Sequence, residues 1–224
     1  MAEFRVSVTA AEQRRLREFL DALRTPCEAP MGPGSPYDSE AFETEFRSKL
    51  LAHHCFMGTP LFQESFDSAF TAACLPAGHE VSPAPAEQRF WDVMIGGRRI
   101  SLKSSKAKSL REGTLHISKL TEAAWIQDCR TATLRRERTL RLFDEYCSEV
   151  EAIIQLRNFG ALRRYELAEI PVTLLAQVLT VGIKQFAADG PTINIPVGKN
   201  PPDFTLKLDR SDAKVTLANI NKNL

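Results

Sequence analysis

The chain has 224 residues, of which 43% are hydrophobic and 25% are charged. This length and composition allow a substantial buried core and argue against extensive disorder. The formal net charge is only +1 at pH 7, so the protein is not globally basic, and any nucleic-acid surface must come from local clusters of lysine and arginine. No apolar run approaches the roughly 20 residues of a membrane span.

Cysteine usage and the start of the chain indicate the compartment. Five cysteines are scattered along the sequence, and no two of them form a Cys-x-x-Cys pair. An odd number of scattered cysteines is typical of reduced thiols, and residues 1–6 lack the apolar region of a signal peptide. We therefore expect a cytoplasmic protein.

Residues 1–58 are predicted to form an N-terminal helical part. Thr9 and Glu12 have the spacing of a capping box that opens a helix reaching about Arg24. A second helix is expected over residues 39–54, where phenylalanine and leucine recur at helical spacing.

A third helix is predicted to begin at Thr59-Pro60, because proline suits the first turn of a helix. Glu64 and Asp67 are three residues apart and lie on neighbouring turns of this helix. The segment 75–88 contains three prolines and is expected to be a loop.

The most informative stretch is 90–108, which has the pattern of two short strands joined by Gly96-Gly97. Both glycines can adopt the positive φ angles of a type I′ or II′ turn. This turn fixes the register, so that residues 93, 94 and 95 face residues 100, 99 and 98, and Asp92 faces Ser101. Because side chains alternate faces, Asp92, Ser101 and Lys103 should share one face, within about 5–8 Å of one another. The opposite face should hold the apolar residues Trp91, Val93, Ile95, Ile100 and Leu102.

Two interpretations of the polar face remain open at this point. Asp92 and Lys103 could form a cross-strand ion pair on a solvated face. Alternatively, Asp92 could hold a divalent cation while Lys103 steers an attacking water and stabilises charge. The basic, serine-rich run that follows fits either phosphate contacts or an ordinary exposed loop.

The remaining elements complete a mixed α/β pattern. Helices are predicted at 118–127, 133–146 and 174–188, and strands at 150–157, 163–172, 192–197, 204–208 and 214–220. The predicted fold is a single α/β domain spanning 1–224, with a mixed central β-sheet flanked by helices and a C-terminal β meander. Within it, we expect residues 59–190 to be the catalytic core and residues 191–224 to be the β-rich C-terminal part.

Asp92 followed by Ser101-Leu102-Lys103 resembles the core motif of the PD-(D/E)xK nucleases. Trp91 replaces the usual proline, and Ser101 replaces the usual second acid. Over roughly residues 60–175 the chain resembles a group of bacterial type II restriction endonucleases. This resemblance rests on Ile100-Ser-Leu-Lys-Ser, Leu115-His-Ile-Ser-Lys-Leu and Tyr165-Glu-Leu-Ala-Glu-Ile-Pro.

The resemblance implies a restriction-endonuclease-like fold and Mg²⁺-dependent hydrolysis of DNA. It implies that Asp92 and the carbonyl of Leu102 bind the metal, while Lys103 stabilises charge and Ser101 holds a metal-bound water. A helix acid would complete the site, with Asp67 the first choice, followed by Glu64 and Glu45. The later acids Glu122 and Glu169 are further choices. The residues expected to contact DNA are Ser104, Ser105, Lys106, Lys108, Arg111, Ser118 and Lys119.

The expected partner is double-stranded DNA, cut at specific sites by a homodimer that restricts foreign DNA in a bacterial cytoplasm beside a cognate DNA methyltransferase. The segment 191–224 could read bases or could be structural scaffold. Because Ser101 carries no charge, the alternative is a catalytically inactive nuclease-fold module that binds DNA or protein. A cysteine hydrolase is disfavoured, since no cysteine lies in a recognisable nucleophile arrangement.

Overall fold

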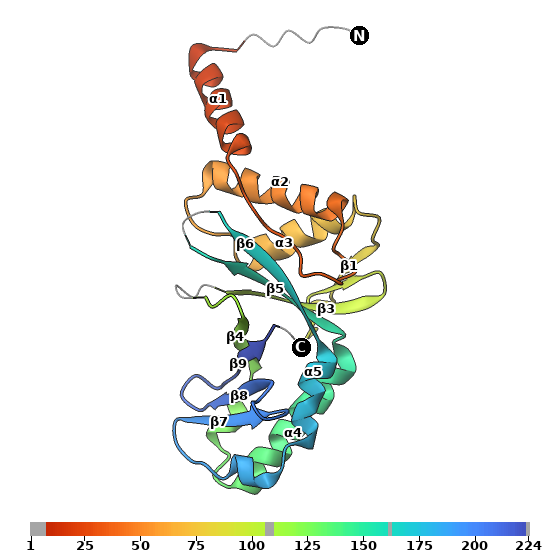
Figure 1. The fold of residues 1–224 in the computed structure, drawn as a ribbon, viewed down its shortest axis with the longest axis vertical. Helices are drawn as coiled ribbons and strands as arrows, with labels where there is room; N and C mark the ends of the chain where they lie inside the picture. The colour runs from red at the N-terminus through yellow and green to blue at the C-terminus, as the bar shows by residue number, and fades with distance from the viewer. Residues whose placement is uncertain (1–7, 106–109, 161–162, 223–224) are drawn as a thin grey trace.

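The computed structural model of the protein describes residues 8–105, 110–160 and 163–222, apart from the side chain of Glu64. Figure 1 shows three levels along the long axis: α1 at one end, a pair of helices above a first β-sheet, and a second sheet with helices at the other end. No helix in these ranges is long and apolar enough to cross a membrane.

Most of the longer helices begin at a residue whose side chain caps the helix. The α-helices are α1 (Ala10–Arg24), α2 (Glu40–Phe56), α3 (Gln63–Cys74), α4 (Ala132–Glu149) and α5 (Val172–Ala176), and short 3₁₀ helices are η1 (Ala124–Gln127), η2 (Gln177–Thr180) and η3 (Ile183–Phe186). Thr9 and Glu12 form the predicted capping box of α1. Ser39 caps α2 by accepting a hydrogen bond from the N–H of Phe42.

The strands form two sheets. They are β1 (Val81–Pro83), β2 (Val93–Ile95), β3 (Arg98–Ser105), β4 (Thr114–Glu122), β5 (Ala152–Asn158), β6 (Tyr165–Pro171), β7 (Thr192–Val197), β8 (Phe204–Asp209) and β9 (Lys214–Asn221). Sheet I has the order β1-β2-β3-β5-β6, and sheet II has the order β4-β9-β8-β7.

Sheet I is a mixed sheet built on the predicted hairpin. Gly96 and Gly97 have φ angles of 56° and 80°, and the register of β2 against β3 is the predicted one, with Val93 opposite Ile100. β3 then pairs in parallel with β5, which places Lys103 beside Gln155. The other pairings in this sheet are antiparallel.

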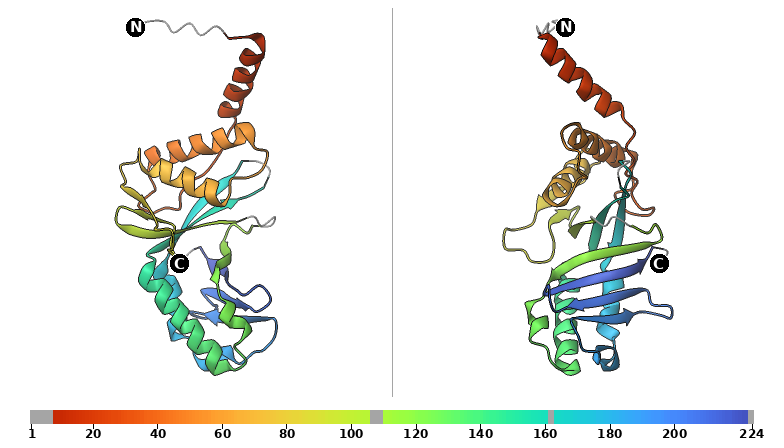
Figure 2. Two further views of the ribbon diagram at one scale, coloured as in Figure 1. Left: turned by 180° about the vertical axis from the view of Figure 1, so that it is seen from behind. Right: turned by 90° about the vertical axis from the view of Figure 1, so that its left-hand side faces the viewer.

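Sheet II contains the predicted C-terminal meander, extended by a strand from the middle of the chain. β7, β8 and β9 follow one another as antiparallel neighbours. β4 pairs with β9, so that Leu115 lies opposite Ile220. Figure 2 shows β4 and β9 running side by side. The C-terminal strands are therefore joined through β9 to β4.

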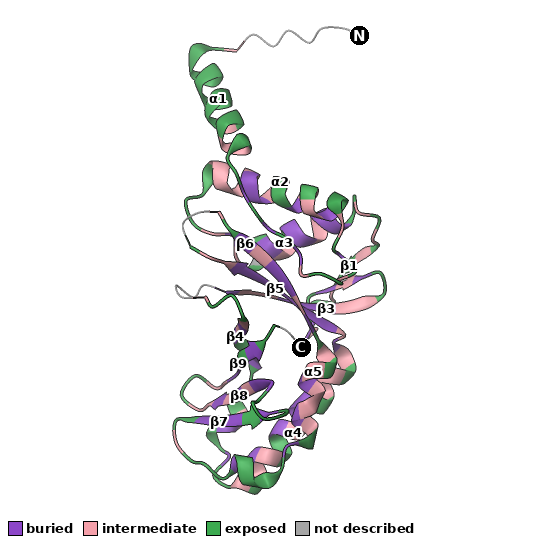
Figure 3. Ribbon diagram, in the orientation of Figure 1, coloured by how far each residue is buried: buried purple, intermediate pink, exposed green. Residues whose placement is uncertain are grey.

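Sheet I separates two hydrophobic cores. The upper core lies between sheet I and the α2–α3 pair, and it contains Phe42, Phe46, Phe70 and the hairpin residue Ile100. The lower core joins the other face of sheet I to sheet II, α4 and α5, and includes Ile153 and Phe143. Figure 3 shows buried residues concentrated in both layers, whereas α1 has none. The prediction of a mixed sheet flanked by helices with C-terminal strands is confirmed.

Several predicted elements differ from the structure. α3 begins at Gln63 rather than at Pro60, because Gln63 adopts φ 41° and its N–H donates to Ser104 Oγ at 3.2 Å. The predicted helix 118–127 is wrong, since this region is the end of β4 followed by η1. Two register shifts in β4 disturb its alternation, which removed the sequence signal of a strand.

Two further corrections concern the hairpin and the helix after β6. The predicted helix 174–188 is broken into α5, η2 and η3, with the β-branched residues 178, 180 and 181 and Gly182 in its middle. Trp91 packs in the lower core with Phe90, not beside Ile100 in the upper core. β2 begins only at Val93, so the strand alternation does not extend back to Trp91.

Candidate active site

A cleft of about 620 Å³ lies where α3, β3 and the C-terminal half of β4 meet. We call it the Asp92 cleft. It brings together residues from four separate segments of the chain, and half of the predicted catalytic and DNA-contacting residues line it. The lining residues are Gln63, Phe66, Asp67, Arg89, Asp92, Leu102, Lys103, Ser104, Ser118, Lys119, Leu120, Thr121 and Glu122.

Asp92 is held rigidly at the end of the hairpin. Its carboxylate Oδ2 accepts a hydrogen bond from the N–H of Leu102 at 2.6 Å and one from the Ser101 hydroxyl at 3.3 Å. Its own N–H donates to the carbonyl of Ile100 at 2.9 Å. Just before it, the ring of Phe90 packs edge-on against Tyr146, with the ring centroids 5.3 Å apart. The carboxylate is therefore fixed by β3 on one side and by the lower core on the other.

Lys103 lies on the same side of β3 as this carboxylate. Its Nζ is 3.8 Å from Asp92 Oδ2, and the two side chains are 22% and 39% exposed. A pair this accessible contributes little to stability. The Lys103 ammonium can therefore exchange this contact for one with a phosphate, and it is placed to meet negative charge that enters the cleft.

Ser101 lies beside Asp92 on the predicted face of the hairpin. It is fully buried and lies outside the cleft lining; its role in holding a metal-bound water stays a prediction. The lower layer of the protein covers this face of sheet I, so the interpretation of a solvated face fails for Ser101. Its hydroxyl donates a hydrogen bond to the Asp92 carboxylate and so helps to hold it in place.

Tyr146 is a residue of this region that sequence reasoning missed. It comes from α4, and its buried hydroxyl makes no hydrogen bond of good geometry within the described chain. The pKa of Tyr146 is raised, mainly by burial; the adjacent Ser101 hydroxyl opposes this effect, and the charge of Asp92 adds to it. Arg89 and Gln63, which line the cleft, were also missed. No local pattern marks any of them, because the contacts are made across the fold.

Asp67 is the predicted helix acid that the structure brings to the cleft. The hydrogen bond from Gln63 N–H to Ser104 Oγ ties the start of α3 to β3 and so sets the position of Asp67. Glu64 lies on the same helix, but its side chain is outside the described residues. Glu45 does not line the cleft and pairs with Lys49 at 2.7 Å within α2.

The two later acids have different positions. Glu122 lines the cleft and pairs with Lys119 at 2.6 Å. Glu169 lies away from the cleft, where it binds Arg98 at 2.7 Å and accepts a hydrogen bond from Ser35 at 2.5 Å. Glu169 is therefore not a candidate to complete this site.

The residues predicted to contact DNA divide in the same way. Ser104, Ser118 and Lys119 line the Asp92 cleft. Ser105 is buried and does not line the cleft. Arg111 lies outside the lining, and its carbonyl accepts a hydrogen bond from Arg157 at 2.5 Å. Lys106 and Lys108 lie outside the described residues.

The donor set of the cleft is compatible with a hard divalent cation. Asp92 and Asp67 provide carboxylate oxygens. The N–H and carbonyl of a strand residue point the same way, so the Leu102 carbonyl points to the edge where its N–H meets Asp92. Mg²⁺ is commonly held by one or two carboxylates, with water and substrate phosphate filling the other positions. Among the described residues, no three His, Cys, Asp or Glu side chains are clustered as a preformed metal cage, which is consistent with a site that the substrate completes.

Comparison with known proteins identifies a class of DNA-cutting enzymes that this chain resembles. The sequence is similar to a type II restriction enzyme, SmaI of Serratia marcescens, with 28% identity over 153 residues. The matched region covers 64% of this chain and 57% of that enzyme. No protein-family model matches the sequence, and no solved structure matches it significantly. The expected resemblance to type II restriction enzymes is supported, and assignment to the PD-(D/E)xK superfamily stays a prediction.

Proposed function

We propose that the protein is a Mg²⁺-dependent endonuclease of the PD-(D/E)xK type that hydrolyses phosphodiester bonds in double-stranded DNA at specific sites. The observation that carries this proposal is the convergence of Asp92, Leu102, Lys103 and Asp67 on one cleft. Similarity to a restriction enzyme supports the same substrate. Its biological role would be restriction of foreign DNA in a bacterial cytoplasm, as a homodimer, with a cognate methyltransferase in the same system.

Each residue has a defined task in this proposal. Asp92, Asp67 and the Leu102 carbonyl would hold the metal, which would supply polarisation of the phosphoryl oxygen and a lower pKa for the attacking water. Lys103 stabilises the negative charge that develops on the phosphate. Ser101 and the N–H of Leu102 keep the Asp92 carboxylate in place. Ser104, Ser118 and Lys119, which line the cleft, would contact the DNA backbone.

The test is cleavage of a supercoiled plasmid by the purified full chain with Mg²⁺ or with EDTA, followed by mapping of the fragment ends. We expect discrete fragments with Mg²⁺ only. Asp67→Asn should lose cleavage, whereas Glu45→Gln, a matched change of an acid on α2 outside the cleft, should retain it. Cleavage that continues in EDTA, or that survives Asp67→Asn, would contradict the proposed metal site.

A second candidate function is a nuclease-fold module that binds DNA without cutting it. It is favoured by the neutral, buried Ser101 in place of an acid. Under this alternative, DNA binding measured by fluorescence anisotropy persists, but no Mg²⁺ or Mn²⁺ concentration produces fragments.

A further inference from the structure

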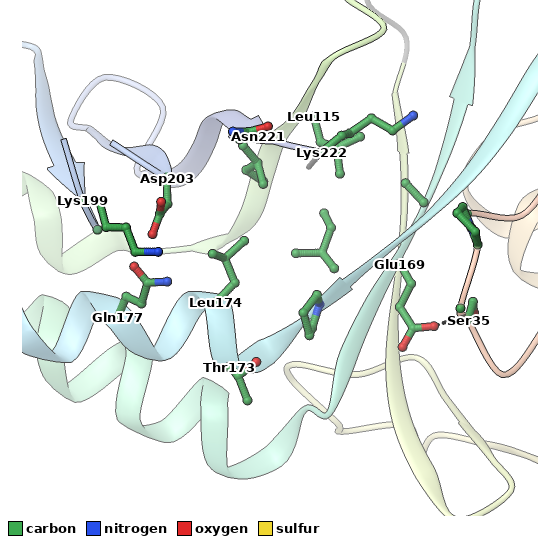
Figure 4. A pocket seen from close by; sticks show the side chains of 18 of the residues that line it. Ser35, Leu115, Glu169, Thr173, Leu174, Gln177, Lys199, Asp203, Asn221 and Lys222 are labelled. Atoms are coloured by element: carbon green, nitrogen blue, oxygen red, sulfur yellow. Dashed lines mark hydrogen bonds between the residues drawn. The ribbon is translucent and has the colours of Figure 1, made fainter. Parts of the chain in front are cut away.

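A second, larger cavity lies at the other end of β4 from the Asp92 cleft. Its volume is about 840 Å³, and it opens between β6, α5 and the last strands of sheet II. Leu115 near the start of β4 lines this cavity, whereas Ser118–Glu122 near the end of β4 lines the Asp92 cleft. Its size is that of a pocket for a small organic ligand. We call it the Asp203 cavity (Figure 4).

The Asp203 carboxylate is the unusual feature of this cavity. Asp203 is only 6% exposed and lines the cavity. Its main chain is fixed by hydrogen bonds with Val197 and Asn221. Within the described part of the chain, its carboxylate makes no hydrogen bond or ion pair. Because this carboxylate borders the cavity, its oxygens can accept hydrogen bonds from donors on a ligand that enters.

Gly198 and Gln177 shape the space beside this carboxylate. Gly198 has a φ angle of 92°, and a Cβ at this position would lie 2.3 Å from Asp203 Oδ2 and 2.7 Å from Gln177 Oε1. The carboxylate and the amide therefore converge on the space that only a glycine leaves open. If the amide is turned to donate one N–H, the carboxylate still has unfilled acceptor positions, because two oxygens accept about four hydrogen bonds.

The rest of the cavity supplies an apolar wall and a cation. Leu115, Leu174 and Ile220 offer aliphatic surfaces suited to the faces of a flat ring. Figure 4 shows Asp203, Gln177 and Lys199 gathered at one end of the cavity, with Leu174 beside them. The other cation, Lys222, already pairs with Glu166. Lys199 is exposed and makes no ion pair with the described residues, so it is available to an anionic group on the ligand.

We propose that the Asp203 cavity binds a nucleobase that carries amino or imino N–H donors, attached to a phosphate. The N–H groups of guanine, cytosine or adenine donate to Asp203, as carboxylates accept from base amino groups elsewhere, and Lys199 meets the phosphate. Thymine presents carbonyl oxygens beside its single N–H and is disfavoured. The nucleobase comes from a free mononucleotide or from a base extruded from duplex DNA; only the second source rests on the proposed nuclease function.

The first arm of the test measures binding of dGMP, dCMP, dAMP and dTMP to the full chain by calorimetry. We expect at least one of the first three to bind at least tenfold more tightly than dTMP. Asp203→Asn should weaken that binding on the order of tenfold to a hundredfold, as expected for loss of hydrogen bonds to a charged group. Asp212→Asn, which changes an exposed acid near the same sheet, should have no effect. Thermal unfolding of each variant confirms that it is folded.

The second arm uses duplex DNA containing 2-aminopurine, without divalent metal so that no strand is cut. A fluorescence rise with wild type and with Asp92→Asn, but not with Asp203→Asn, would show that the bound nucleobase is one extruded from duplex DNA. Binding of free nucleotide without this rise would assign the mononucleotide. The proposal is overturned if no nucleotide binds and no rise occurs, or if Asp203→Asn leaves both signals unchanged. If wild type fails to cut plasmid but still binds a nucleotide through Asp203, the nuclease function is refuted and the proposal for the Asp203 cavity stands.

Discussion

Replacement of Asp92 separates its structural role from its proposed chemical role. Asp92→Asn keeps an oxygen that can accept the hydrogen bond from Leu102 N–H, now 2.6 Å long, but removes the charge. The ion pair with Lys103 spans 3.8 Å, and the Asp92 side chain is 39% exposed, so its loss should reduce the free energy of unfolding by no more than about 1 kcal/mol. We therefore expect a folded protein.

Asp92→Ala should behave differently in stability but not in activity. It removes the charged acceptor of the Leu102 N–H, and the Leu102 side chain is buried. Loss of this hydrogen bond should reduce the free energy of unfolding by about 1–3 kcal/mol. Both variants should lose cleavage by at least a hundredfold to a thousandfold, roughly the effect of removing one electrostatic group from a preorganised site.

The assay combines urea unfolding followed by circular dichroism with plasmid cleavage at fixed Mg²⁺. Cleavage within about tenfold of wild type by a folded Asp92→Asn preparation would refute the assignment of the active site. If Asp92→Ala is as stable as Asp92→Asn, the carboxylate does not hold the Leu102 N–H, and the argument for a rigid Asp92 fails.

Four further predictions concern single side chains. Lys103→Met should lower the turnover rate more than DNA affinity, because it acts on charge that develops in the transition state; equal losses in both would contradict this role. Lys119→Ala should flatten the salt dependence of DNA binding by about one unit of slope, whereas Lys184→Ala on η3 should leave the slope unchanged. Arg157→Ala should reduce the free energy of unfolding by about 1–3 kcal/mol, because this 1% exposed side chain binds Glu166 at 2.5 Å, while Glu166 keeps its pairing with Lys222; a urea midpoint near that of wild type would argue against a buried ion pair. Burial lowers the pKa of His54 in the folded protein. Its contribution to stability is therefore present above an unfolded pKa of about 6.5 and is lost as the pH falls through the lower folded pKa. Between pH 7 and pH 5, the melting temperature should fall further for wild type than for His54→Asn.

The Asp92–Lys103 hairpin was predictable because its determinants are local. Two adjacent glycines select a tight turn, and the period of two then fixes which residues face each other. The same holds for the cap and apolar stripe of α2, and for β7, where alternation with period two is unbroken. Asp92 and Lys103 come within 3.8 Å as a consequence of this register.

Residues contributed by distant segments could not be predicted in this way. The position of Asp67 depends on the contact between Gln63 and Ser104. The assignment of β4 depends on its pairing with β9, whose register shifts hide the strand pattern. The Asp203 cavity requires β6, α5 and the C-terminal strands together, so no stretch of sequence contains its signal.

The sequence alone therefore determined the hairpin, the order of most elements and the acid–lysine pair, because turn geometry and hydrophobic periodicity act within a few residues. Tertiary structure alone decided that Ser101 is buried, that Asp67 rather than Glu45 or Glu169 reaches the Asp92 cleft, and that the Asp203 carboxylate borders a cavity. These outcomes depend on which surfaces exclude water when sheet I packs against the helices and sheet II, and burial of that kind is a property of the assembled layers.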